Sequence, residues 1–171
     1  AGFLIESPLG GNWSFGATAR RSYIGDVLKV VAKNNPNFDL TVAPYYYDGL
    51  VTVAHRFSEK ENLRFSLLGS YDELSFLLKE PAETAPAIRG SINNQTKFYR
   101  FITSYQKQFT DDDTFRASAA AGPDFIHVDV SDLYFDVSQM TYSLRSDWAH
   151  RYSLHHLTRI GTDSRLANAT V

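Results

Sequence analysis

Large aromatic residues recur ten positions apart in four places, on what would be the same face of a β-strand. The pairs are Trp13 and Tyr23, Tyr47 and Phe57, Tyr99 and Phe109, and Phe115 and Phe125. A strand rises about 3.3 Å per residue, so ten residues tilted by about 40° span a height of roughly 25 Å. This is about the height of the apolar band of an outer-membrane β-barrel, which carries an aromatic girdle at each water interface. The spacing therefore predicts strands that cross a membrane.

Apolar and polar residues alternate with a period of two around these aromatics, which is typical of strands with one apolar and one polar face. Such segments are expected at about 2–6, 12–24, 45–57, 63–72, 97–109, 115–125, 139–148 and 154–161. The expected fold is all-β: an antiparallel transmembrane β-barrel meander of about eight strands, forming part of a larger barrel. We expect residues 1–171 to be a single β-barrel segment without a plug domain.

The expected connections alternate in length. Short ones are predicted at 7–11, 58–62, 110–114 and 149–153, and long ones at about 25–44, 78–96 and 129–137. In outer-membrane barrels short turns lie on the periplasmic side and long loops on the outer side. A soluble β-sandwich, in which the same aromatics would be core residues, has no reason to sort its loops in this way.

The aromatic residues then divide into two predicted girdles, one near each set of connections. The girdle near the short turns contains Trp13, Phe57, Phe109, Phe115 and Trp148, and the outer girdle contains Tyr23, Tyr47 and Tyr99. Three charged or polar residues, Arg21, His55 and Lys107, interrupt the lipid-facing pattern. Each is close to a predicted interface, where such side chains can extend toward the headgroups.

Charged residues gather on the opposite face of the predicted strands. The candidates for lining a lumen are Arg20, Arg56, Arg64, Asp72, Arg100, Arg116 and Arg145. Such residues commonly form structural ion pairs, and arginines can also bind an anionic ligand through paired hydrogen bonds. The sequence leaves both roles open.

No motif in the chain indicates catalysis, a cofactor or a metal. His127, with Asp124, Asp129 and Ser131 nearby, is the closest approach to a catalytic group, and we expect no enzyme activity from it. Residues 111–113 are three aspartates without the glycine and distal glutamate of an EF-hand loop, so we expect a solvated turn. Adjacent residues of a strand point to opposite faces, which argues against a metal site at the two histidines 155–156.

Composition excludes several other classes of protein. The net charge of −2 argues against a nucleic-acid partner, and the absence of cysteine excludes disulfides and thiolate metal sites. No stretch approaches the roughly 20 apolar residues of a membrane-spanning helix. Because Ala1 does not begin a signal peptide, we expect a processed chain or a piece of a longer one.

Several runs of residues resemble the barrel strands of TonB-dependent outer-membrane receptors. They are residues 2–11, 13–24, 46–50, 63–66 and 69–72. The resemblance implies a Gram-negative outer membrane and a role in nutrient uptake. The implied partners are outer-membrane lipid and the plug and further strands, from the same gene or another chain, of a barrel of about 22 strands. The chain departs from this pattern: it has about a third of those strands, no plug or TonB box before Gly2, and no terminal aromatic residue after Ala167.

Other functions remain open on the sequence alone. An open sheet would expose two unpaired edges, which lipid does not tolerate. The chain must therefore either close on itself as a small barrel, with a structural or adhesive role, or receive strands from another polypeptide. A soluble β-protein that binds a small ligand is a third possibility, and the transported solute is not readable from the sequence.

Overall fold

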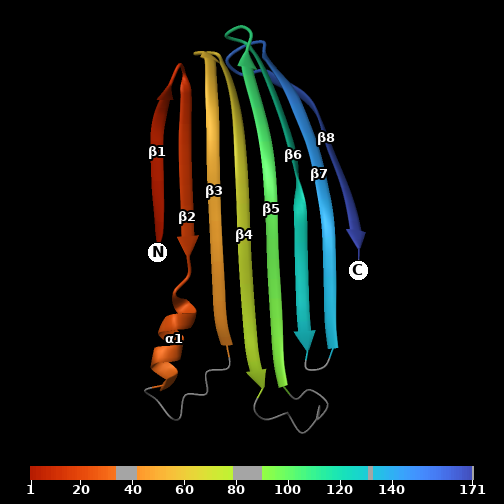
Figure 1. Ribbon diagram of the computed structural model, residues 1–171. Helices are drawn as coiled ribbons and strands as arrows, with labels where there is room; N and C mark the ends of the chain where they lie inside the picture. Colours follow the sequence, from red (N-terminus) through yellow and green to blue (C-terminus); the bar gives the residue numbers. More distant parts are fainter. Residues whose placement is uncertain (34–41, 79–89, 131–132, 171) are drawn as a thin grey trace.

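The protein forms one antiparallel sheet of eight strands that pair strictly in chain order (Figure 1). The computed structural model describes residues 1–33, 42–78, 90–130 and 133–170. The strands are β1 (Gly2–Gly10), β2 (Trp13–Arg21), β3 (Val42–Ser58), β4 (Glu61–Leu78), β5 (Gly90–Gln108), β6 (Asp113–Val130), β7 (Leu133–Arg151) and β8 (Leu157–Thr170). The all-β meander predicted from the sequence is confirmed.

The register explains why this sequence forms one two-faced sheet. Residues that pair across an antiparallel sheet point to the same face, and neighbours along a strand point to opposite faces. One row of successive partners crosses all eight strands and is apolar throughout: Ile5, Ala17, Val51, Leu67, Phe101, Ala121, Tyr142 and Leu166. The adjacent row on the opposite face is Glu6, Gly16, Thr52, Ser66, Ile102, Ala120, Ser143 and Arg165. We call these two surfaces the apolar face and the polar face.

Several strands are longer than the sequence predicted. β4 continues to Leu78 and β5 begins at Gly90, so part of the expected long connection 78–96 is strand. The expected connection 129–137 is also mostly strand, because β6 runs to Val130 and β7 begins at Leu133. The alternation changes phase in these extensions: Leu74, Ile126 and Val137 lie on the polar face, and Glu73, His127 and Asp136 lie on the apolar face. The backbone ladder therefore continues where the pattern that marks a strand in the sequence is interrupted.

One helix, α1 (Ile24–Lys33), lies beyond the end of β2 in a segment that the sequence predicted as a loop (Figure 1). It begins after Ser22, whose Oγ accepts a hydrogen bond of 3.2 Å from the Ile24 N–H. Asp26 in the first turn complements the positive end of the helix dipole. Asp26 also accepts a hydrogen bond of 3.3 Å from the Tyr45 hydroxyl, which ties α1 to β3.

The turns at the opposite end of the sheet are short. Gly10, Gly11 and Asn12 all have positive φ between β1 and β2, which suits a tight hairpin. The predicted turn at 149–153 is displaced, because β7 continues to Arg151 and residues 152–156 make the connection. Residues 155–156 are therefore not in a strand, and the His156 ring lies 3.0 Å from the Ser153 hydroxyl.

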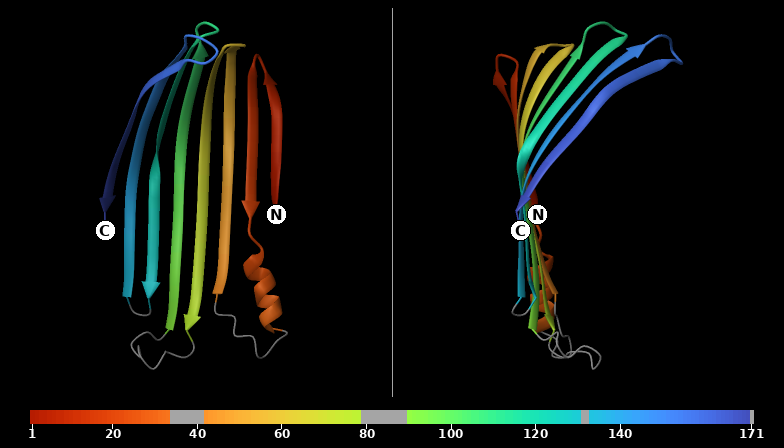
Figure 2. Two further views of the ribbon diagram at one scale, coloured as in Figure 1. Left: turned by 180° about the vertical axis from the view of Figure 1, so that it is seen from behind. Right: turned by 90° about the vertical axis from the view of Figure 1, so that its right-hand side faces the viewer.

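The sheet is not closed, and β1 and β8 form its two edges. The chain termini lie in these edge strands (Figure 1). Seen edge-on, the strands overlap near the long connections and fan out toward the short turns, so the sheet is twisted (Figure 2). An eight-stranded barrel closed within this chain would need β1 to pair with β8, and this pairing does not occur in the sheet.

Successive strands are staggered. Trp13, the first residue of β2, connects through successive partners to Thr162, which lies five residues after Leu157, the first residue of β8. Five residues correspond to about 17 Å along a strand, and the six strand spacings to about 29 Å across the sheet. The strands therefore lean by roughly 30° from the perpendicular to the line of short turns, close to the tilt of barrel strands from the barrel axis.

Candidate functional site

No part of the chain that the structure describes covers the apolar face. Among the described residues the only buried hydrophobic side chain is Ala149, at 7% exposure. Large apolar side chains in the middle of the sheet are half exposed, including Leu67 at 53%, Phe101 at 51% and Leu144 at 55%. The described part of the chain therefore lacks the packed core between two sheets that a soluble β-sandwich requires.

Aromatic rings gather at the end of the apolar face near the short turns. Phe109 and Trp148 stack with ring centroids 5.1 Å apart, and Phe115 lies 6.2 Å from Trp148. At the same end of the apolar face, but in β2 and β3, His55 lies between Trp13 and Phe57, with centroid distances of 4.4 and 4.5 Å. The five aromatics assigned to this end by sequence thus form two clusters at one level.

A second aromatic group lies toward the long connections. Tyr47 and Tyr71 are register partners, with ring centroids 5.9 Å apart. The Arg21 guanidinium lies 5.3 Å from the Tyr23 ring and 5.6 Å from the Tyr47 ring. Tyr23 lies just after the end of β2, and Tyr99 is one row closer to the middle of the sheet.

The sequence pairs aromatics ten residues apart, and the structure keeps two such pairs inside a single strand: Tyr47 and Phe57 in β3, and Phe115 and Phe125 in β6. Phe115 and Phe125 both belong to β6 and share the apolar face. Phe109 follows the end of β5, and Phe57 lies at a register shift between Arg56 and Ser58.

Beyond these aromatics the apolar face becomes polar within one row. The next row of partners is Tyr45, Glu73, Gln95, His127 and Asp136. His127 lies between two carboxylates, with Nδ1 2.6 Å from Asp136 and Nε2 3.0 Å from Asp129. Hydrogen bonds to Asp136 and then Asp129 raise the pKa of His127 above its ordinary value of 6.5.

All seven lumen-facing candidates share the polar face of the sheet. They are Arg20, Arg56, Arg64, Asp72, Arg100, Arg116 and Arg145. Toward the long connections both arginines are paired: Arg20 Nε lies 2.8 Å from Asp48, and Arg100 Nη2 lies 2.6 Å from both oxygens of Asp124. Asp72 instead accepts a hydrogen bond of 3.2 Å from the Ser70 hydroxyl.

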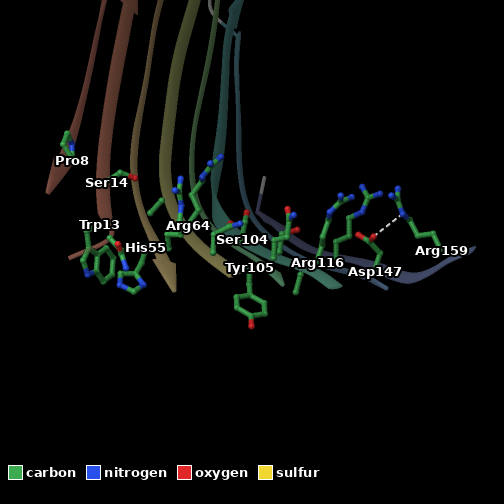
Figure 3. A pocket seen from close by; sticks show the side chains of 18 residues that line it. Pro8, Trp13, Ser14, His55, Arg64, Ser104, Tyr105, Arg116, Asp147 and Arg159 are labelled. Atoms are coloured by element: carbon green, nitrogen blue, oxygen red, sulfur yellow. Dashed lines mark ion pairs between the residues drawn. The ribbon is translucent and has the colours of Figure 1, made fainter. Parts of the chain in front are cut away.

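Toward the short turns the polar face contains a hollow of about 810 Å³. Five arginines and one aspartate are the charged residues of the polar face that line it: Arg56, Arg64, Arg116, Arg145, Arg159 and Asp147. Figure 3 shows Arg64 and Arg116 on one side of the sheet, and Trp13, His55 and Tyr105 on the other. The arginines of this hollow, which we call the arginine hollow, thus project away from the apolar face.

The charges in the arginine hollow are only partly balanced. Asp147 lies 3.3 Å from Arg159, an ion pair without hydrogen-bond geometry, and Arg145 lies 4.0 Å from Asp163. Arg56, Arg64 and Arg116 have no carboxylate partner within the described ranges. The hollow therefore has a net positive charge. The sequence identified Arg56, Arg64, Arg116 and Arg145 but missed Arg159, which lies inside the expected strand 154–161 but was not assigned to either face.

Of the residues that the sequence offered as a catalytic group, the three that the structure describes, His127, Asp124 and Asp129, are not brought together on one face of the sheet. His127 and Asp129 lie on the apolar side of the register, whereas Asp124 lies on the polar face and is held by Arg100. Ser131 lies outside the described residues.

Two of the three aspartates of the turn, Asp111 and Asp113, have different side-chain partners. Asp111 lies 2.6 Å from Lys60, and Asp113 lies 2.7 Å from both Thr110 and His150. These contacts lower the pKa of both carboxyl groups. Within the described ranges, no cluster of three or more histidine, cysteine or acidic residues could hold a metal ion.

The described helix is too short to cross a membrane. Comparison with known proteins finds no matching family model and no matching curated protein.

Proposed function

We propose that this chain forms part of a transport barrel in the outer membrane of a Gram-negative bacterium. The resemblance of its strands to those of TonB-dependent receptors suggests a role in nutrient uptake. In this proposal the plug and the remaining strands come from the same gene or from another chain.

The observation that carries the proposal is the uncovered apolar face. Exposed contiguous apolar surface on this scale requires an apolar environment, which can be lipid or another protein. Here the face ends abruptly at aromatic rows on both sides. In β6, Phe115 and Phe125 are ten residues apart, about 33 Å along the strand, and the strand tilt reduces this to a height of roughly 29 Å. That height matches a bilayer core.

The unpaired edges support a partial barrel over a free sheet. β1 and β8 would expose backbone N–H and C=O groups, and each unsatisfied group in lipid costs several kcal/mol. The stagger of the strands is the one that a tilted barrel wall needs. Additional strands joining at β1 and β8 would satisfy both edges.

Phase separation in a detergent solution tests this function. The chain, expressed together with its genetic neighbours, is expected to enter the detergent phase and to resist extraction from membranes by alkaline carbonate. Recovery of a folded monomer of this length in the aqueous phase, without detergent, would contradict the proposal and favour a soluble β-protein.

A further inference from the structure

The arginine hollow contains two pairs of like charges that face each other across a neutral strand. In the register, Arg56 pairs with Asn62, and Arg64 lies two residues further along β4, which makes the two arginines diagonal neighbours. Arg116 pairs with Asp147, and Arg145 is its diagonal neighbour on β7. Diagonal neighbours in an antiparallel pair have Cβ atoms about 7 Å apart.

The strand between these pairs contributes hydrogen-bonding groups without charge. Ser104 of β5 is the partner of both Arg64 and Ser118, and Gln106 is the partner of both Asn62 and Arg116. Arg64 and Arg116 are thus two strands apart, or about 10 Å across the sheet. The result is a polar floor flanked by two cationic pairs.

Arginines placed so close together repel one another. An anion bound between them attracts both guanidinium groups, and this attraction offsets their repulsion. The planar guanidinium group binds phosphate and carboxylate oxygens through paired hydrogen bonds. Because Arg56, Arg64 and Arg116 have no carboxylate partner within the described ranges, their donors are available for such a ligand.

The hollow fits a small solute better than a lipid or a polypeptide. Its volume of about 810 Å³ falls in the usual range of small-molecule sites, roughly 300–1,000 Å³. The two large aromatic residues that border it, Trp13 and Tyr105, point toward the opposite face (Figure 3), and the arginines are accompanied by short polar side chains such as Ser14 and Ser104. A peptide would therefore find no large apolar side chain to pack against beside the arginines. The hollow lies on the face opposite the apolar one, so a lipid could not place its headgroup here and its tails on the apolar face.

We propose that the arginine hollow binds a small solute that has at least two phosphate or carboxylate groups, one near each arginine pair. This inference rests on the proposed function, because it gives the chemical class of solute that would meet the polar face of the transport route. Charge is also unevenly distributed along that face: the arginines toward the long connections are paired with aspartates, whereas the arginines without a carboxylate partner lie toward the short turns. An anionic solute would therefore be attracted to the end of the face near the short turns.

The test measures binding of inorganic tripolyphosphate by isothermal titration calorimetry to the detergent-solubilised protein, purified with any polypeptide bound to it. Arg64→Gln and Arg116→Gln are each expected to weaken binding by about tenfold or more, since hydrogen bonds to charged groups are the strong ones. Arg165→Gln is the matched control. Arg165 lies on the polar face of β8, outside the hollow, and has no carboxylate partner within the described ranges. Its loss is expected to change affinity by no more than about twofold.

Absence of tripolyphosphate binding would overturn the inference, and so would equal weakening by all three substitutions, which indicates a diffuse charge effect. The circular dichroism spectrum of each variant establishes that it is folded. Failure of this site and failure of the proposed function are distinguishable. A protein that stays in the membrane but does not bind tripolyphosphate contradicts only the site, whereas a water-soluble protein that binds it at Arg64 and Arg116 contradicts only the membrane function.

Discussion

Gly122 lies where the backbones of β5 and β6 leave no room for a side chain. A Cβ atom at this position would collide with the Tyr99 carbonyl oxygen and lie 3.1 Å from the Arg100 Cα. The next residue, Pro123, has no N–H to offer, and the register between β5 and β6 is interrupted here. The Tyr99 carbonyl instead accepts a hydrogen bond of 2.8 Å from Arg100 Nη1. Glycine and arginine together allow the proline within a paired strand.

Gly122→Ala is therefore expected to destabilise the protein by about 1–3 kcal/mol, the usual cost of overpacking. The measurement is the midpoint of urea unfolding of the membrane-embedded protein, followed by tryptophan fluorescence. Gly16→Ala in β2 is the matched control, because a Cβ atom there has its nearest neighbour at 3.9 Å. Equal midpoints for the two variants would show that the close approach at Gly122 is not a constraint.

Two ion pairs on the polar face differ in how far water reaches them. Arg100 and Asp124 have side-chain exposures of 17% and 27%, and Asp124 also accepts a hydrogen bond of 3.0 Å from Thr141. In the Arg20–Asp48 pair the aspartate is 20% exposed but the arginine is 69% exposed. The charge left behind when Asp48 is neutralised is therefore in water, whereas Arg100 would remain shielded. Solvent weakens exposed pairs, whereas a shielded charge that loses its partner is costly.

Asp124→Asn is accordingly expected to lower the free energy of unfolding by about 1–3 kcal/mol. Asp48→Asn is expected to change it by less than about 1 kcal/mol. Urea unfolding of both variants in the same membrane preparation compares them directly. A larger effect at Asp48 would mean that shielding does not distinguish these pairs.

At the scale of elements, the sequence predicted the middle of each strand far better than its ends. Alternation is strong where one face is apolar, as in the central part of β6 around Ala119, and it located that segment well. It fails in the outer parts of β4 and β6, because the alternation changes phase there: Leu74 and Ile126 lie on the polar face while the backbone still pairs. Arg159 was missed because no clear alternation assigns a face to the residues at the start of β8. Helix α1 was missed because its ten residues lie in a segment where the search for strand alternation predicted only a long connection.

The outer hairpin of β6 and β7 has a contact that depends on pH. Hydrogen bonds that His127 donates to Asp136 and Asp129 raise the pKa of His127 in the folded protein, so the imidazolium contact is fully present below the ordinary histidine pKa of 6.5. The contact is lost as the pH rises through the raised value. Amide hydrogen exchange near His127, corrected for intrinsic rates, is therefore expected to be slower at pH 6 than at pH 9.

His127→Gln is expected to remove this pH dependence, because glutamine does not titrate. His156→Gln is the matched control, since His156 lies in the opposite turn and contacts Ser153. Protection of the hairpin that is the same at both pH values in the unaltered protein would contradict the role of His127.

At the scale of the whole molecule, the central claim is that one face of the sheet meets lipid and the other does not. The sequence predicted both faces, because the apolar and polar residues that alternate along each strand remain in register across the sheet. It could not predict whether the sheet closes, since closure depends on what pairs with β1 and β8. The orientation of side chains toward lipid is therefore the property to measure.

The most direct measurement uses single-cysteine variants, which are unambiguous because the chain contains no cysteine. Spin labels at Ala117, Ala119 and Ala121 occupy the apolar face of β6, and labels at Ser118 and Ala120 occupy the polar face. In the membrane-embedded protein, the first three are expected to be relaxed by oxygen, which concentrates in lipid, and the other two by a water-soluble nickel chelate. Relaxation by the nickel chelate at all five positions would contradict the account, because it would place both faces in water.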